Sequence, residues 1–135
     1  MEEYTLPSNS EGKYSEKGST FSALAFPVND VAEVKAKLIQ LKEQFPDAIH
    51  ICYGYRIREG GRLDEFATDA GEPKGSSGLP ILNALKRNQI VDAVIFVVRY
   101  FGGIKLGISG LINAYGSAAK EALANANFNK WVQLV

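Results

Sequence analysis

The chain has 135 residues, of which 46% are hydrophobic and 22% charged, so it is long enough to bury the core of one domain and is neither disordered nor fibrous in composition. Its formal net charge of zero gives no argument from bulk charge for binding nucleic acid or an anionic membrane. The charge is unevenly placed, with 8 Lys/Arg against 13 Asp/Glu over residues 1–72 and 7 against 2 over residues 73–135, which fits either a two-faced surface or ordinary solvated faces that average out.

The sequence indicates a cytoplasmic protein. No apolar run approaches the roughly 18 residues needed to span a bilayer, and the acidic start at Glu2 and Glu3 excludes an ordinary signal peptide. The single cysteine, Cys52, cannot form an internal disulfide, which favours a reducing compartment. Because Cys52 stands in an apolar, strand-like run, we expect a small core residue rather than a nucleophile.

Hydrophobic periodicity and turn residues divide the chain into strands and helices. After a polar arm over residues 1–18, we expect a strand at 20–28, a helix at 31–45, a strand at 49–58, a hairpin arm at 62–68, a long loop at 69–78, a helix at about 78–90, a strand at 92–100, a helix at 108–123 and a short strand at 131–135. Asn29 or Asp30 can cap the first helix. Hairpins interspersed with helices predict an α+β fold, a two-layer sandwich of a mixed sheet with helices on one face. No linker divides the chain, so we expect a single domain over residues 1–135.

Two glycine-containing loops, at residues 69–78 and 99–107, carry most of the unusual residues. Each precedes a helix, whose free backbone N–H groups attract anions, and the glycines let the backbone approach a partner closely. With cationic side chains nearby, these loops predict an anion site for a phosphate-bearing ligand. The glycine spacing matches neither a P-loop nor a dinucleotide fingerprint. The candidate binding residues are Lys74, Ser76, Ser77, Arg99, Tyr100, Gly102, Gly103, Lys105 and Gly107.

The same loops offer other chemistry. Tyr100 and Phe101 can stack on bases, as aromatic side chains do in single-stranded nucleic-acid binders, although strand alternation turns only one ring outward. Asp69 and Glu72 can hold magnesium or perform acid–base work, although clustered loop acids are more often solvated or capping groups. His50 is the only histidine, so any Ser-His-Asp mechanism depends on it. Because no Cys and His cluster has metal-ligand spacing, we expect no metal or cofactor.

Two long motifs stand in order along the chain: Asp69-x-Gly71-Glu72-Pro73-x-Gly75-x-x-Gly78-x-Pro80-Ile81-Leu82, then Val98-Arg99-Tyr100-Phe101-Gly102-Gly103-x-Lys105-Leu106-Gly107. Residues 25–28, residues 50–56 and the pair Ala114-Tyr115 extend the pattern. Together they resemble the Impact/YigZ family over about residues 18–125, and motifs this long and ordered are far more specific than a lone glycine signature.

The resemblance implies a fold like the second domain of a small-subunit ribosomal protein and domain IV of elongation factor G. Bacterial members usually carry a second, ferredoxin-like domain, and we predict a single-domain member because the 135 residues end before it would begin. Eukaryotic relatives regulate translation by competing with a stress-activated initiation-factor kinase for a ribosome-associated activator. Ala70 and Ile51 stand where the family commonly has an acid and a histidine, which weighs against an inherited hydrolytic mechanism.

We therefore predict a non-catalytic binding module that engages RNA, the ribosome or a translation-associated protein and regulates translation. Arg99 and Lys105 would contact phosphate or an acidic partner surface. Asp69 and Glu72 would brace the adjacent loop, through backbone N–H groups or a pair with Arg99. Two alternatives stay open: a phosphoester or peptide hydrolase with Asp69, Glu72 and His50 as its catalytic candidates, and a purely protein-binding regulator. Oligomeric state stays open as well.

Overall fold

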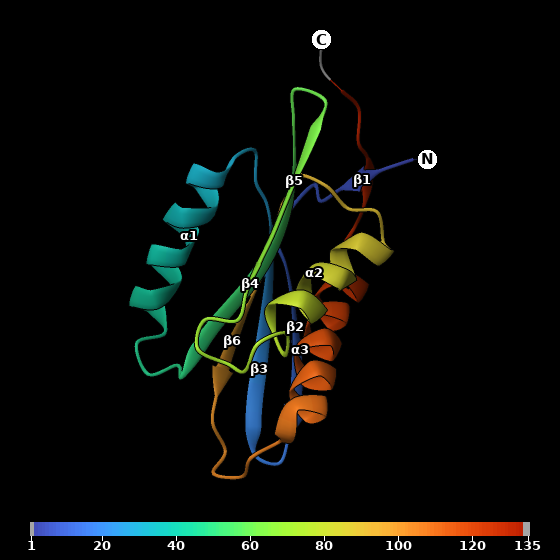
Figure 1. Ribbon diagram of the computed structural model, residues 1–135. Coiled ribbons are helices and arrows are strands. Elements are labelled where there is room, and N and C mark those ends of the chain that lie inside the picture. The colour runs from blue at the N-terminus through green and yellow to red at the C-terminus, as the bar shows by residue number, and fades with distance from the viewer. Residues whose placement is uncertain (1, 134–135) are drawn as a thin grey trace.

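The computed structural model describes residues 2–133 and holds a five-stranded sheet, a two-stranded sheet and three helices (Figure 1). In chain order the elements are β1 (Tyr4–Thr5), β2 (Ser10–Glu16), β3 (Ser19–Pro27), α1 (Val31–Gln44), β4 (His50–Glu59), β5 (Arg62–Thr68), α2 (Gly78–Arg87), β6 (Ala93–Tyr100), α3 (Gly107–Ala124) and β7 (Asn129–Lys130). None of these helices is both long enough and apolar enough to cross a membrane.

Strand β6 is the centre of the large sheet, whose order is β2-β3-β6-β4-β5. Seven of its eight residues are buried, as expected for a strand with neighbours on both edges and cover on both faces. Alternation divides its side chains between two cores. Ile95 and Val97 lie in one core with side chains of α2 and α3, whereas Phe96 and Val98 lie in the other with side chains of α1.

The predicted α+β class is confirmed, but two of its details are wrong. Each neighbouring pair in the large sheet is antiparallel, so the sheet is not mixed. The helices cover both faces: α1 lies on one side, and α2 and α3 lie on the other (Figure 1). The physical reason is visible in β6, whose two apolar faces both require cover. Val34 and Leu41 supply that cover from α1.

The ends of the chain also differ from expectation. Residues 1–18 are not only an arm, because β2 pairs with β3 along its whole length and β1 pairs with β7. A left-handed turn at Lys17 (φ 49°) and Gly18 (φ 79°) joins β2 to β3. The predicted strand at residues 131–135 is wrong for 131–133, since pairing with β1 occurs at Asn129–Lys130. The rest of that prediction, residues 134–135, lies outside the described residues.

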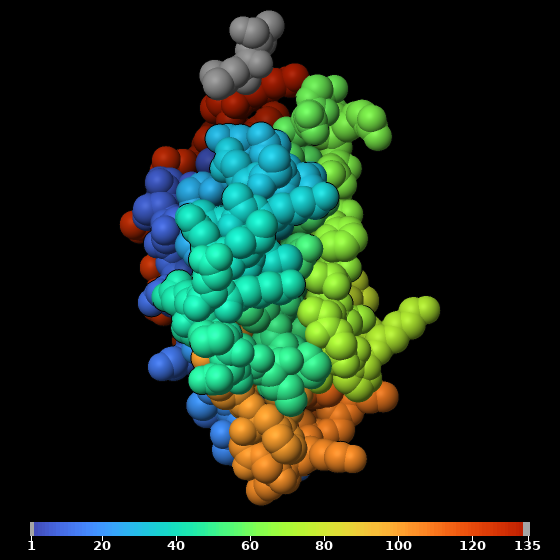
Figure 2. Space-filling model, turned by 90° about the vertical axis from the view of Figure 1, so that its left-hand side faces the viewer, coloured from blue at the N-terminus to red at the C-terminus, as the bar shows by residue number. Residues whose placement is uncertain are grey.

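Local sequence accounts for the start of α1 and for the hairpin. The Asp30 side chain caps α1 by accepting a hydrogen bond from the backbone N–H of Glu33 at 2.9 Å. Gly60 and Gly61 both adopt positive φ angles in the two-residue turn between β4 and β5, the conformation that such hairpins require. Figure 2 shows α1 lying across its face of the molecule, with the loop that follows β6, in orange, forming the lower end. That end carries the candidate site.

Candidate functional site

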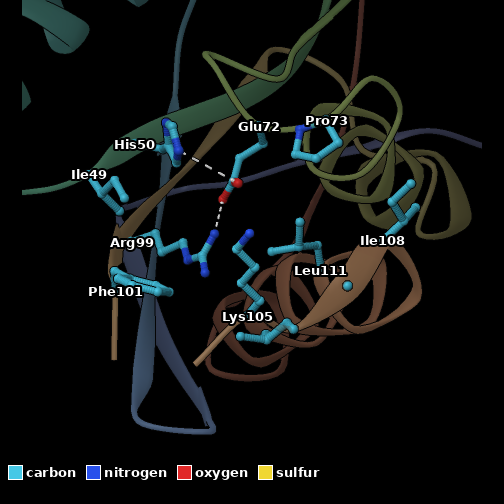
Figure 3. A pocket seen from close by; sticks show the side chains of 11 residues that line it. Ile49, His50, Glu72, Pro73, Arg99, Phe101, Lys105, Ile108 and Leu111 are labelled. Carbon is cyan, nitrogen blue, oxygen red and sulfur yellow. Dashed lines mark hydrogen bonds and ion pairs between the residues drawn. The ribbon is translucent and has the colours of Figure 1, made fainter. Parts of the chain in front are cut away.

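A pocket of about 400 Å³ opens beside the end of β6, where the 69–77 loop meets the start of α3 (Figure 3). It lies on the α2 and α3 side of the sheet. Its walls combine an ionic group with apolar side chains, an arrangement typical of binding sites. The lining residues are Ile49, His50, Glu72, Pro73, Arg99, Phe101, Lys105, Leu106, Gly107, Ile108 and Leu111.

Strand register places His50 and Arg99 together at the base of this pocket. They are direct partners across the β4–β6 ladder, and the backbone N–H of Ile49 donates to the carbonyl of Arg99 at 2.9 Å. Alternation along β6 turns Arg99 to the same face as Ile95 and Val97, toward α3. Two residues that are 49 positions apart in the sequence therefore share one site.

Glu72 is the hub of the buried polar contacts. Its Oε2 accepts a hydrogen bond from Nη1 of Arg99 at 2.6 Å and another from the hydroxyl of Tyr115 at 2.5 Å. Its Oε1 lies 3.6 Å from Nε2 of His50, whose Nδ1 donates to the carbonyl of Ala70 at 2.9 Å. The side chains of Glu72 and Arg99 are only 4% and 6% exposed. A buried charge needs such a partner, because the attraction between the two charges offsets the free-energy cost of removing them from water.

Arg99 keeps unused donor capacity in spite of this pair. Its guanidinium lies between the rings of Phe21 and Phe101, with 5.4 and 5.6 Å from Cζ to the two ring centroids. Nη2 reaches the Ser19 hydroxyl only at 3.5 Å, and Nε has no hydrogen-bond partner among residues 2–133. A buried, unpaired N–H of this kind is rare in proteins and calls for an explanation.

Asp69 organises the 69–77 loop. Its Oδ1 accepts hydrogen bonds from the backbone N–H groups of Ser77 and Gly78, at 3.2 and 2.9 Å, and from the Ser77 hydroxyl at 3.0 Å. Its Oδ2 accepts from the backbone N–H of Gly75 at 2.8 Å. Burial opposes ionisation of this carboxyl, but these donors outweigh it and hold the pKa of Asp69 below its ordinary value. The carboxylate thereby takes the place of a cap for α2.

The Cys52 thiol and the Tyr115 hydroxyl, both beside the pocket, have raised pKa values that favour their neutral forms. Burial is the largest cause that raises the pKa of the Cys52 thiol, to about 11, and the thiol donates to the carbonyl of Asp69 at 3.2 Å. Burial also raises the pKa of Tyr115, helped by the nearby Cys52 and Glu72. Cys52 is fully buried in the core, as its apolar context predicted. Neither group is available as a nucleophile at neutral pH.

The structure divides the predicted binding residues into exposed and internal ones. Lys74 and Lys105 are exposed, and Lys105 lines the pocket. Ser76 and Ser77 are fully buried and donate to oxygens of their own loop, those of Pro73 and Asp69.

The remaining predicted residues, one tyrosine and three glycines, also differ in whether they are open to a ligand. Tyr100 packs with the core on the α1 side, away from the pocket. Gly103 and Gly107 adopt φ angles of +89° and +77° with open space around them. Gly102 packs against the backbone of Gly18, so its missing side chain serves a contact within the chain.

Sequence reasoning missed the apolar part of the site. Three exposed apolar side chains line the pocket, and two more stand next in sequence to lining residues; their exposed fractions run from 44% to 58%. They form, together with Lys105, what we call the pocket face: Ile49, Phe101, Ile104, Ile108 and Ile112. Part of their signal in the sequence is the pair Ile108 and Ile112, because a spacing of four residues places these two side chains on one side of α3. Ile104 lies in the turn before the helix, where this spacing does not apply.

Comparison with known proteins identifies the family. The model of the Impact N-terminal domain matches residues 17–123. The chain belongs to this family. The resemblance predicted from the two motifs is therefore confirmed. A Thermus thermophilus protein named as an IMPACT family member in the pol 5'region is 45% identical over 108 residues, which are 80% of this chain and 56% of that protein.

Solved structures agree with the fold. A hypothetical protein aligns with a TM-score of 0.86 and 28% identity, covering 96% of this chain and 64% of that one. The two-domain translational regulator Yih1 aligns with a TM-score of 0.51 and 22% identity, covering 93% and 48%. The chain spans 44% to 61% of the length of the curated bacterial relatives that it matches.

Proposed function

We propose that this protein is a binding module in the regulation of translation, which engages a translation-associated protein through its pocket face. The regulatory context comes from family membership and from Yih1, a protein of the same fold that is described as a translational regulator. The observation that carries the binding mode is the set of exposed apolar side chains around a pocket whose buried Glu72–Arg99 pair is internally compensated.

The state of the acidic residues favours binding over hydrolysis. Both carboxylate oxygens of Asp69 accept hydrogen bonds from its own loop and the start of α2, and Oε2 of Glu72 accepts from Arg99 and Tyr115. A general base or metal ligand needs a lone pair free to meet substrate or metal. In addition, no three His, Cys, Asp or Glu side chains within residues 2–133 form a group suited to a metal ion.

The state of the cations favours a protein partner over RNA. Nucleic-acid binding depends on several cations that are free to contact phosphates. Arg99 is buried and paired with Glu72, which leaves Lys105 as the exposed cation lining the pocket. Contiguous exposed apolar side chains are instead typical of protein–protein contacts.

The test is a cell-free translation extract that makes a reporter protein, to which the purified chain is added. The wild-type chain should change the reporter yield. The double variant Ile104→Ser with Ile108→Ser should lose most of that effect. The matched control is Ile39→Ser with Val132→Ser, because these side chains are 60% and 68% exposed outside the pocket face, against 55% and 58% for Ile104 and Ile108. Absence of any effect of the wild type, or equal loss in both double variants, contradicts the proposal.

A photo-crosslinker separates protein from RNA as the partner. The variant Ile104→p-benzoylphenylalanine places the reactive group on the pocket face. Illumination in the extract should yield a product that nuclease leaves intact and protease shortens, and this product should be lost when Ile108→Ser is added. A product that nuclease removes, with yield falling steeply as salt rises, would replace the protein partner by RNA.

A further inference from the structure

The start of α3 presents free backbone donors to the pocket. Helix α3 is 18 residues long, no side chain caps its first turn, and that turn contains no acidic residue of its own, although the Glu16 carboxylate of β2 lies beside Gly110. The first N–H groups of a helix have no partners within the helix, and the helix dipole makes this end attractive to negative charge. A Cβ atom added at Gly107 would meet nothing within 4 Å, so the backbone at this point is open to approach.

Two cationic side chains face the same space. Lys105 has no ion pair among residues 2–133, and in Figure 3 it extends into the pocket on the side of Arg99 and Glu72. Arg99 lines the pocket, its side chain is 6% exposed, and its Nε has no hydrogen-bond partner in that same range. Arg99 is paired with Glu72 through Nη1, so only its Nε is left without a partner; this donor is an observation independent of the helix start, and both favour an anionic ligand.

The negative charge already in the pocket does not cancel this excess. Oε2 of Glu72 accepts from Arg99 and Tyr115, while Oε1 faces His50. One carboxylate thus meets one guanidinium, and the ammonium of Lys105 stays uncompensated. Opposite charge from a partner would satisfy both this ammonium and the open N–H groups.

The walls of the pocket define what accompanies the anion. Ile49, Phe101, Ile108 and Leu111 line it beside the polar groups. A sugar-phosphate chain would place further phosphates and hydroxyl groups against these apolar surfaces, at a cost in desolvation. A carboxylate side chain with apolar neighbours fits the same walls, and about 400 Å³ is enough for such a short segment.

We propose that the pocket receives a glutamate or aspartate side chain of the partner protein, flanked by apolar side chains, with its carboxylate bound by Lys105 and by the backbone N–H groups at the start of α3. The apolar flanks contact Phe101 and Ile108. This inference rests on the proposed function and names the chemistry of its partner.

The probe is a capped tripeptide, leucine–glutamate–leucine, added to the full ¹⁵N-labelled chain while amide chemical shifts are followed by NMR. A matched leucine–glutamine–leucine peptide has the same shape without the charge, and inorganic phosphate tests a bare anion. The glutamate peptide should shift the amides of Gly107, Ile108 and Ser109, and it should bind about tenfold more tightly than the glutamine peptide, as expected for a charge-assisted hydrogen bond. Lys105→Gln should remove this preference, whereas Lys120→Gln, an exposed lysine farther along α3, should preserve it.

Equal affinity for the two peptides, shifts confined to other parts of the chain, or no shift from either peptide at millimolar concentration would overturn the inference. Tighter binding of phosphate than of the glutamate peptide would also overturn it, in favour of a phosphate-bearing ligand. The proposed function fails separately. If the peptides do not bind but the Ile104 and Ile108 double variant still loses its effect on translation, the protein-binding function stands and the carboxylate assignment falls.

Discussion

Breaking the buried pair between Glu72 and Arg99 should destabilise the fold strongly. The two side chains are 4% and 6% exposed, and the shortest contact, Nη1 to Oε2, is 2.6 Å. Removing one member of such a pair leaves a desolvated charge without a partner, which costs on the order of 3–5 kcal/mol. We expect about 3 kcal/mol for Glu72→Gln, at the lower end because a glutamine oxygen can still accept from Tyr115. Arg99→Met should cost about 4 kcal/mol, since His50 and Tyr115 alone remain beside the carboxylate.

The double variant decides whether the pair itself is responsible. Glu72→Gln combined with Arg99→Met leaves neither charge buried, so its destabilisation should fall short of the sum of the single effects by at least about 2 kcal/mol. Urea unfolding at pH 7 measures each value. With a slope of about 2 kcal/mol per molar urea, Glu72→Gln should lower the midpoint by about 1.5 M.

An exposed pair on the same protein is the control. Lys130 and Glu2 lie 2.9 Å apart with side chains 64% and 58% exposed, so Lys130→Met should leave the midpoint unchanged within error. The reasoning is refuted if Glu72→Gln behaves like this control. It is also refuted if the two single effects add without coupling, because the buried charges would then not depend on one another.

Three further variants test the loop, the core and the turn. Because the pKa of Asp69 is lower in the folded chain than in the unfolded one, ionisation of this carboxylate stabilises the fold above about pH 4, and this stabilisation is lost as pH falls through the folded pKa. Asp69→Asn should therefore cost about 2 kcal/mol at pH 7, and its urea midpoint should fall less than that of the wild type between pH 5 and pH 3. An equal fall of the two midpoints would contradict this. Cys52, with its pKa raised to about 11, should resist iodoacetamide at pH 8 in the folded chain and react in urea, as read by mass spectrometry; rapid labelling without urea would show that the thiol is accessible. Gly102→Ala places a Cβ 2.1 Å from the carbonyl carbon of Gly18 and should lower the thermal unfolding midpoint strongly. Gly103→Ala should lower it far less, because its Cβ meets no atom within 4 Å and only the positive φ angle is strained. Equal effects of the two variants would show that the backbone at Gly18 moves aside without cost.

The sequence predicted those parts of the fold that depend on local pattern. The apolar run before Arg99 indicated a central strand, and β6 is that strand. The Asp30 cap and the turn at Gly60 and Gly61 follow from residues that hold the same conformations in many proteins. The placement of α1 depends instead on which face of the sheet its stripe covers. The helical spacing of apolar residues in α1 does not say which face of the sheet the helix covers, since both faces of β6 are apolar.

The site was predictable in its members more than in its contacts. Loops at 69–78 and 99–107 both border the pocket, and Asp69 braces its loop as expected. The two alternatives predicted for Asp69 and Glu72 are divided between them: Asp69 accepts from backbone N–H groups, and Glu72 pairs with Arg99. Tyr115 was not placed beside them, because its spacing along α3 marks only the buried stripe of a helix. Contacts between residues that are 43 positions apart, such as that between Tyr115 and Glu72, arise from packing of one element on another.

The pocket also shows how one segment can serve both stability and the recognition proposed above. Arg99 and Glu72 neutralise each other below the surface, so the site keeps its shape without a ligand. The loop that follows then exposes Phe101, Ile104 and Lys105 on a turn whose left-handed Gly103 leaves the backbone uncovered. The same pocket holds the ammonium of Lys105, which has no ion pair among residues 2–133, the start of α3 and the apolar side chains of the pocket face. Rigid presentation of a few such groups lowers the entropic cost of binding, and this supports the proposed recognition of a short segment of a partner.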